Sequence, residues 1–225
     1  TFTGRVVPSG STTVTETEVE TETGNTVSTV TQTVTDATGQ STTNTTITST
    51  NDSGNIQTNV SMTDSIDGQT VQSTTTVTVP TTETGAAAVD PSTVAEALQQ
   101  MQEATPDGDS AELTVKIQPE GYTPDRAEVV IDQIALQTIR DSGAKLEVSG
   151  DIGTISVPTE VAGNLSEIGG DVSMSISTAN KSVMTSAQQE RVGDAPVFEL
   201  SANAGDQSVH ELGGDVVITL PYTLS

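Results

Sequence analysis

The sequence predicts a mainly β protein with a minor share of helix, in which N-terminal antiparallel β-meander repeats precede an α+β domain. Glycines recur at nearly constant intervals through residues 1–79, and the stretches between them alternate with the period of a half-exposed strand. From residue 111 onward, short strand-forming runs are interrupted by segments with helical spacing, and hairpins dominate. This order of elements favours α+β over a doubly wound α/β fold.

Turn-forming residues set the period of the N-terminal repeats. The glycines stand at intervals of 15, 15 and 14 residues, at Gly24, Gly39, Gly54 and Gly68. Each is followed by Asn or Gln, and an Asp precedes three of them within three residues. Glycine accepts positive φ, and Asp or Asn bonds to nearby backbone, so these are turns. A strand and a short turn in each period make an internal repeat, and we expect an antiparallel meander.

The strands of this meander differ in how many apolar residues they carry. Two of them place a mainly apolar row on one face, made of Ile56, Thr58, Val60 and Met62 in one and of Val71, Ser73, Thr75, Val77 and Val79 in the other. By contrast, "STTNTTITST" (41–50) contains only Ile47. In "TVTETEVETET" (13–23), glutamates occupy one face and Val19 lies among threonines on the other. A packed sandwich needs more apolar inner faces than these.

Three structures are compatible with so polar a region. It forms a thin, largely single-layer sheet or stalk, it packs one face onto the second half of the chain or onto another chain, or it is a disordered threonine-rich linker. Low hydrophobicity favours disorder because little burial offsets the ordering entropy. The regular turn spacing argues against disorder.

Composition changes near Pro80, and we expect three segments. These are a Thr-rich β-repeat region over 1–80, a linker with a short helix over 81–110 and an α+β module over 111–225. In the linker, Asp90 can cap a helix that begins at Pro91. Its helically spaced apolar residues are Val94, Leu98 and Met101. The run Pro106-Asp107-Gly108-Asp109 is predicted to end it in a turn.

The C-terminal module is predicted element by element. Asp132 caps a helix over 133–142 that Gly143 stops, and a hairpin that turns at Gly150-Asp151 follows over 144–158. The other elements are strands at 111–117, 127–131 and 196–202, a helical or irregular link at 159–168, a polar loop at 178–195, and a strand after each Gly-Gly-Asp at 169–171 and 213–215. In each copy the preceding apolar residue, Ile168 or Leu212, is expected to pack just before the turn.

Charge and composition restrict the partners and the setting. The formal net charge is −24, with 31 acidic and 7 basic residues, so nucleic acid and anionic membranes are poor partners. Acidity also fits a halophilic protein, although charged residues make up only 17% of the chain. Cysteine is absent, which excludes disulfides and thiolate sites. No run reaches the roughly 20 apolar residues that span a bilayer. No signal peptide is recognisable, so an exported form would be a mature or trimmed fragment.

No residue pattern predicts catalysis, a cofactor or a metal, and we expect no enzyme. The Gly-Gly-Asp copies offer Asp171 and Asp215, but one carboxylate from each motif is too few for calcium, and we interpret both as turns. Other carboxylates that could bind calcium are Asp52, Asp64, Asp67, Asp107, Asp109 and Glu112, but none has EF-hand spacing. His210, the single histidine, is expected to be exposed where a strand begins. Aromatic residues for a carbohydrate cleft are limited to Phe2, Tyr122, Phe198 and Tyr222.

Two stretches resemble a known class of protein. "AEVVIDQIALQTIRDSGAKLEVSGDIGTISVP" (127–158) and "VGDAPVFELSANAGDQSVHELGGDVVITLPYTLS" (192–225) resemble the region that precedes surface-layer-homology repeats in bacterial S-layer and other cell-surface proteins. The "LPYT" ending is the more specific marker. The resemblance covers roughly 111–225 and implies an extracellular structural module. Such chains continue beyond "LPYT" into wall-binding repeats, so we expect this sequence to be a fragment without its anchor.

These observations favour a non-catalytic structural component of a bacterial cell surface or wall, acting as a spacer or scaffold. Its expected partners are cell-wall or surface-layer components, together with self-association. The alternative is an adhesin, or a filament subunit that assembles itself, which binds a glycan or protein through exposed strand edges.

Overall fold

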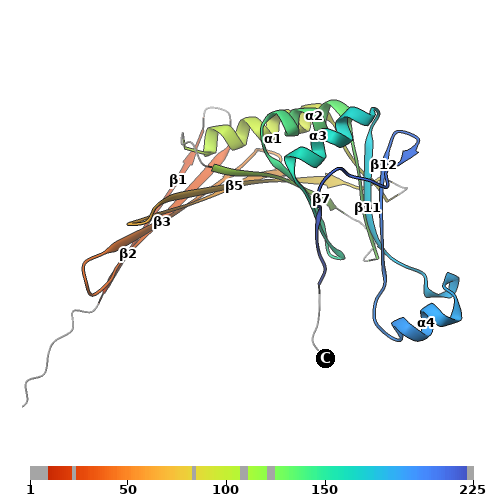
Figure 1. The fold of residues 1–225 in the computed structure, drawn as a ribbon. Helices are drawn as coiled ribbons and strands as arrows, with labels where there is room; N and C mark the ends of the chain where they lie inside the picture. Colours follow the sequence, from red (N-terminus) through yellow and green to blue (C-terminus); the bar gives the residue numbers. More distant parts are fainter. Residues whose placement is uncertain (1–9, 22–23, 83–84, 107–110, 121–124, 222–225) are drawn as a thin grey trace, which may run out of the picture. The chain divides into compact units, whose positions relative to one another are not determined.

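The computed structural model describes residues 10–21, 24–82, 85–106, 111–120 and 125–221 (Figure 1). The chain divides into two compact units, one formed by Thr1–Thr75 with Gln99–Leu113 and the other by Thr76–Leu98 with Thr114–Ser225. The predicted fold class is confirmed, since the protein is mainly β with a minor share of helix. The predicted segment boundaries at residues 80 and 110 stay predictions. No helix in the described parts of the chain is long and apolar enough to cross a membrane.

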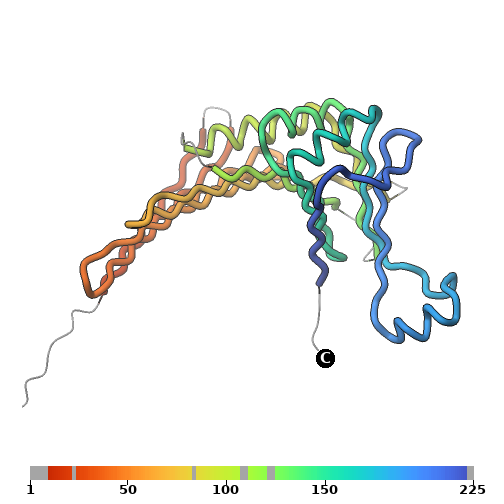
Figure 2. The backbone as a smooth tube through the Cα atoms, viewed as in Figure 1, coloured from red at the N-terminus to blue at the C-terminus, as the bar shows by residue number. Residues whose placement is uncertain are grey.

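Five consecutive strands form the meander of the first unit (Figure 2). Their bounds are β1 Ser11–Glu20, β2 Thr26–Thr35, β3 Ser41–Thr50, β4 Ile56–Ser65 and β5 Gly68–Pro80. They are neighbours in chain order, and the pairs β1–β2, β2–β3 and β3–β4 are antiparallel and in continuous register. The predicted antiparallel meander is therefore confirmed.

The glycine turns have the backbone geometry that the spacing predicts. Gly24, Gly39, Gly54 and Gly68 have φ values of 85°, 87°, 72° and 117°. In the second turn, the backbone N–H groups of Thr38 and Gln40 donate to Asp36 Oδ1 at 2.8 and 3.0 Å. The Thr38 hydroxyl, followed by the Gln40 N–H, holds the pKa of Asp36 below its ordinary value. Asp and Gly therefore fix this turn together.

Burial in the meander follows the amount of apolar sequence in each strand. The rows predicted for β4 and β5 are buried, except that Met62 is half-buried. In β1 every residue is exposed on both faces. Hydroxyl pairs link neighbouring strands, at Thr31–Thr45 (3.3 Å), Thr33–Thr43 (3.1 Å), Thr35–Ser41 (2.8 Å) and the buried Thr58–Thr75 (2.8 Å). The threonines thus pair across strands where an apolar sandwich would pack side chains.

Helix α1 (Pro91–Ala104) begins where the sequence predicts. Its end contributes the buried Gln100 and Met101 to the first unit. Gln100 Nε2 donates to the carbonyls of Ser49 at 2.8 Å and Ile56 at 3.4 Å, so the helix end lies beside β3 and β4. The Thr105 hydroxyl donates to Ser73 Oγ at 2.8 Å. The helix expected in the linker therefore covers one face of the polar sheet.

Asp90 caps α1, and its removal gives a testable loss of stability. Its Oδ1 accepts from the Thr93 N–H at 2.9 Å and from the Ser92 hydroxyl at 2.6 Å. The Ser92 hydroxyl and the Thr93 N–H hold the pKa of Asp90 below its ordinary value. Asp90→Ala is expected to lower the free energy of unfolding by about 0.5–2 kcal/mol, and Asp90→Ser by less.

The loss is measured by urea unfolding at neutral and acid pH. A depressed carboxyl pKa stabilises the fold above the unfolded pKa, and this stabilisation disappears as pH falls through the folded value. The difference between wild type and Asp90→Ala should therefore shrink below about pH 4, near the unfolded carboxyl pKa. If the stability difference between wild type and Asp90→Ala stayed the same in acid, the Asp90 carboxylate charge would not contribute to the cap.

The second unit contains two groups of strands. In the larger sheet, β7 (Ala111–Glu120) runs parallel to β9, β9 and β10 form a hairpin, and β14 lies antiparallel to β10. A separate five-stranded sheet has the order β13-β12-β11-β8-β6, with only β6 parallel to its neighbour. The remaining bounds are β6 Ala87–Val89, β8 Arg126–Ile131, β9 Lys145–Gly150, β10 Gly153–Val157, β11 Val172–Thr178, β12 Phe198–Ala204, β13 Gln207–Ser208 and β14 Val217–Thr219.

Helices α2 (Gln133–Asp141) and α3 (Thr159–Ile168) pack against each other, and both contact β9 (Figure 1). Asp132 caps α2, where its carboxylate accepts from the Ile134 N–H at 2.7 Å. The unit's core contains Val115, Ile117, Val129, Ile131, Leu136, Ile139, Leu146, Val148, Leu165, Val172 and Ile176, all buried. The predicted helix at 133–142 and its cap are confirmed.

Two local predictions in this unit are wrong. The hairpin turns at Asp151 and Ile152, because Gly150 and Gly153 are the last paired residues. The predicted polar loop contains a 3-10 turn, Lys181–Val183, and helix α4, Ser186–Val192. The Thr185 hydroxyl accepts from the Gln188 N–H, and the Gln188 side chain accepts from the Thr185 N–H, so a capping box starts α4.

Candidate functional site

The first candidate site is the free edge of β1. This strand is the first in the order of its sheet, and it pairs with β2 over all ten residues. Within the described residues, no strand pairs with its other side. An edge strand presents unpaired N–H and C=O groups at alternate residues, which is the template for strand addition.

Charge on this edge is confined to one face. Glu16, Glu18 and Glu20 alternate along β1 and are exposed. On β2 the residues opposite them are Val30, Ser28 and Thr26, which are uncharged. The other face of β1 carries threonines and Val19, which is 60% exposed. The edge is thus polar, anionic on one side and neutral on the other.

The second candidate site is an apolar cavity of about 170 Å³ within the second unit. It is lined by Ile155, Val157, Val161, Leu165, Met174, Ser175, Leu200, Ser201, Ala202, Val209, His210, Leu212, Val216 and Ile218. The hydroxyls of Ser175 and Ser201 bond to each other at 2.7 Å, which leaves them little polarity to offer a ligand. Leu200 and Ile218 are partly exposed at 47% and 39%. The cavity therefore suits a small apolar group.

His210 lies at this cavity and is exposed, as predicted, but no strand begins there, since β14 starts at Val217. It precedes the segment that leads to β14. Ser175 and Ser201, the hydroxyls among the lining residues, are bonded to each other rather than to the imidazole. A base needs a nucleophile within hydrogen-bond reach, and these two hydroxyls are already bonded to each other.

The two Gly-Gly-Asp copies use their glycines differently. In the first copy, Gly169 and Gly170 have φ values of 91° and 84°, in the region that favours glycine. In the second copy, Gly213 has φ 70°, but Gly214 is needed for space, since a Cβ there would lie 2.8 Å from Val161 Cγ2. Asp171 and Asp215 are both exposed.

Both copies precede strands, as predicted. The apolar residue before each copy was also expected to pack, and this prediction is correct for only one of the two. Ile168 is 42% exposed, so the prediction that it packs is wrong. Leu212 is half-buried, as expected, and it lines the cavity, which was not expected. Ile168 is the last residue of α3.

Gly170 gives a test of the first copy. A Cβ at Gly170 would lie 3.0 Å from Gly205 Cα, and the Gly205 N–H donates to the Asp171 carbonyl at 2.9 Å. Gly170→Ala should lower the free energy of unfolding by about 1–3 kcal/mol, through backbone strain and this contact. Gly143→Ala is the matched control, because Gly143 has φ 75° but nothing within 4 Å of its Cβ position. Urea unfolding that shows no larger loss for Gly170→Ala would contradict the close approach.

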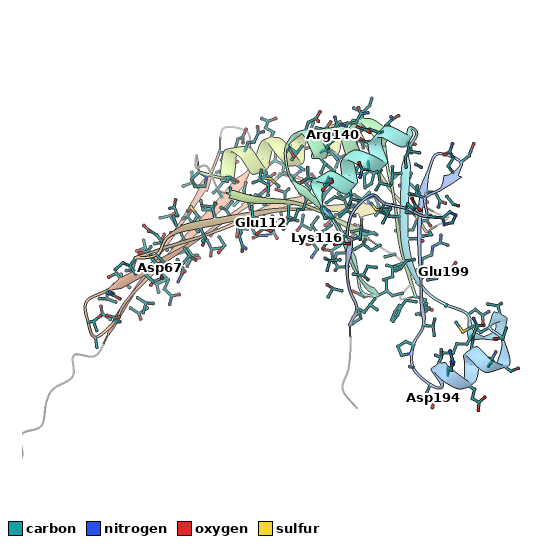
Figure 3. All side chains as sticks on the ribbon, in the orientation of Figure 1. Asp67, Glu112, Lys116, Arg140, Asp194 and Glu199 are labelled. Atoms are coloured by element: carbon teal, nitrogen blue, oxygen red, sulfur yellow. The ribbon has the colours of Figure 1, made fainter. Side chains whose placement is uncertain are left out.

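The carboxylates proposed as calcium ligands are not brought together where they are described. Asp107 and Asp109 lie outside the described residues. Asp67 and Glu112 are on separate elements of the first unit (Figure 3), and Glu112 Oε2 accepts from Gln72 Nε2 at 3.4 Å. No group of three or more His, Asp or Glu side chains that could hold a metal occurs in the described part of the chain. Phe2, Tyr122 and Tyr222 also lie outside it.

Comparison with known proteins gives no relative: no protein-family model, no curated protein and no solved structure matches the chain. The resemblance to S-layer proteins therefore stays a prediction. The Tyr and Thr of its marker "LPYT" fall outside the described residues, and Leu220 and Pro221 follow β14.

Sequence reasoning missed the cavity. Its lining comes from β10, α3, β11, β12 and the segment around β14, which are far apart in the sequence. The only signal within the sequence was the apolar alternation of Val216 and Ile218, which indicated one face of a strand without indicating its neighbours. The β1 edge was foreseen in outline, as an exposed polar strand.

Proposed function

We propose that this chain is a non-catalytic structural component of a bacterial cell surface, S-layer-like or wall-associated, that acts as a spacer or scaffold. The observation that carries the proposal is the meander of β1, β2 and β3, which extends as ten-residue strands with few buried side chains. Its backbone ladders and cross-strand threonine bonds need little apolar core. Such a sheet provides the length that a spacer needs and keeps a hydrated surface.

Composition supports an exposed setting for the same sheet. The net charge of −24 keeps copies of the chain apart and in solution. The chain has no thiol to oxidise outside the cell.

The surface location is tested on intact cells of the source organism. A Glu-specific protease that does not cross membranes is added, because Glu16, Glu18 and Glu20 are exposed. We expect the chain to be cleaved on intact cells while a cytoplasmic marker stays whole. Cleavage that occurs only after lysis would contradict a surface location.

A second candidate function is binding or self-assembly through strand edges, as in an adhesin or filament subunit. The free edge of β1 favours it, since the whole ten-residue strand is exposed. Light scattering against concentration tests self-assembly, because a filament subunit gains mass as concentration rises whereas a spacer does not.

A further inference from the structure

We propose that β1 accepts an extended segment of another protein as an added strand, and that this segment carries Lys or Arg at every second position. The inference deepens the strand-edge candidate by naming the chemistry of its partner. It does not depend on a surface location, so the peptide experiments below and the protease test can fail independently.

Backbone geometry makes β1 a docking edge. All ten residues pair with β2, from Ser11 opposite Thr35 to Glu20 opposite Thr26, so the pairing is continuous along the strand. It is the outermost strand of its sheet, and within the described residues nothing pairs with its outer side. Every second residue of such a strand directs its N–H and C=O outward, where a partner strand can bond to them.

The side chains of β1 specify what the partner should carry. An added strand places its side chains about 4.5–5.5 Å from those directly opposite on β1. Glu16, Glu18 and Glu20 lie on one face, after Thr12 and Val14, so a partner paired with residues 16–20 presents every second side chain to a carboxylate. On the other face the partner meets Thr15, Thr17 and Val19. The matching segment therefore alternates a basic residue with Thr or Val.

Among the described residues of the first unit, no cation is present to pair with the carboxylates of β1. The described residues of the first unit contain no Lys or Arg, and the residues opposite the three glutamates on β2 are uncharged. Two ion pairs, Arg126–Glu128 and Arg140–Asp141, both belong to the second unit. A basic strand would thus meet carboxylates that are not already paired.

A second copy of the chain is a poorer occupant of the same edge. Antiparallel pairing of two β1 strands about a two-fold axis places the glutamate rows of both copies on the same face, where glutamates lie directly opposite or diagonal to one another, depending on the register. Like charges directly opposite each other destabilise a strand pair. Each copy also carries a net charge of −24. The glutamate row thus blocks self-pairing and favours a basic partner.

The side-chain part of the proposal is tested with a labelled peptide that alternates Thr and Lys over ten residues, the length of β1. Its binding to the full chain is followed by fluorescence anisotropy at low salt. The control peptide has the same composition with its lysines contiguous. We expect the alternating peptide to bind more tightly, and equal binding of the two would overturn the proposal.

Matched protein variants separate the edge from the overall charge. The variant Glu16→Gln/Glu18→Gln/Glu20→Gln should weaken binding of the alternating peptide by about threefold to a hundredfold, from three opposed pairs. The control Asp64→Asn/Asp67→Asn/Glu103→Gln removes the same charge elsewhere in the first unit and should leave binding nearly unchanged. Equal weakening by both, or no binding at all, would overturn the proposal. If the triple variant does not fold, Glu18→Gln takes its place.

The backbone part is tested with N-methylated peptides. Two peptides are made, one with methyl groups on the amides of its odd-numbered residues and one with methyl groups on those of its even-numbered residues. An added strand bonds to β1 through only one of these sets, so one methylated peptide should lose binding and the other retain it. Binding that survives both modifications, or that is lost with both, would contradict addition at a single edge.

Discussion

Replacing Met101 by Ala is expected to lower the free energy of unfolding by about 2–5 kcal/mol, among the largest effects of any single change in the first unit. Met101 is 1% exposed, on the helix end that covers the meander. The adjacent Gln100 fixes this end by donating to the carbonyls of Ser49 and Ile56. With so few apolar side chains in the meander, the loss of one buried thioether removes a large share of the burial that holds the helix there.

The matched control is Gln102→Ala, on the exposed side of the same helix, which should change stability by less than about 0.5 kcal/mol. Urea unfolding followed by circular dichroism measures both. Equal stability of the two variants would show that α1 does not hold the polar sheet. The role assigned to the helix would then be wrong, although the strand register would stand.

Leu165→Ala is expected to cost a similar 2–5 kcal/mol in the second unit. Leu165 is 1% exposed in α3 and lines the apolar cavity of about 170 Å³. Its truncation enlarges a space that is already present, so neighbouring side chains regain little contact. The loss in free energy of unfolding should therefore lie in the upper part of this range.

Glu167→Ala is the control for this change, since Glu167 is exposed on the same helix. Thermal unfolding of wild type, Leu165→Ala and Glu167→Ala gives the comparison. A loss no greater than that of Glu167→Ala would mean that the cavity collapses around the smaller side chain, and would contradict a rigid apolar site.

The parts of the fold that the sequence could predict are those set by local chemistry. The turns follow from residues such as Asp36 and Gly39, because a positive φ and an Asx bond are decided within five residues. The buried faces of β4 and β5 follow from alternation alone. The start of α2 follows from Asp132, whose carboxylate needs only the next backbone N–H groups.

What the sequence could not predict depends on contacts between distant segments. Gln100 bonds to the Ser49 carbonyl, 51 residues away in the sequence. A local sequence pattern therefore could not predict that the end of α1 packs on the polar sheet. The strand after the second Gly-Gly-Asp is only Val217–Thr219, because its length is set by pairing with β10. The turn at Asp151 and Ile152 is displaced because register with β9 decides which residues remain unpaired.

The candidate sites show the same division. The glutamate row of β1 was visible in the sequence, and the structure adds that β1 is an edge strand. The cavity was not visible, because His210 and Leu212 meet Leu165 only in the folded chain. From the sequence, Gly214 was interpreted as a residue that gives the turn its backbone freedom. In the structure, its missing side chain makes room for Val161.

Amide hydrogen exchange of β2 and β3 tests most directly whether a threonine-rich sheet with little core is an ordered scaffold. β2 is paired on both sides over its full length, and β3 pairs with β2 over its full length and with β4 from Thr43 to Thr50. We expect their amides to exchange at least about a hundredfold more slowly than those of an unfolded chain, and alternate amides of β1 to exchange faster because they face outward. If the amides of β2 and β3 exchanged at the rate of an unfolded chain, the ordered scaffold would be contradicted and the alternative of a disordered threonine-rich linker would be favoured.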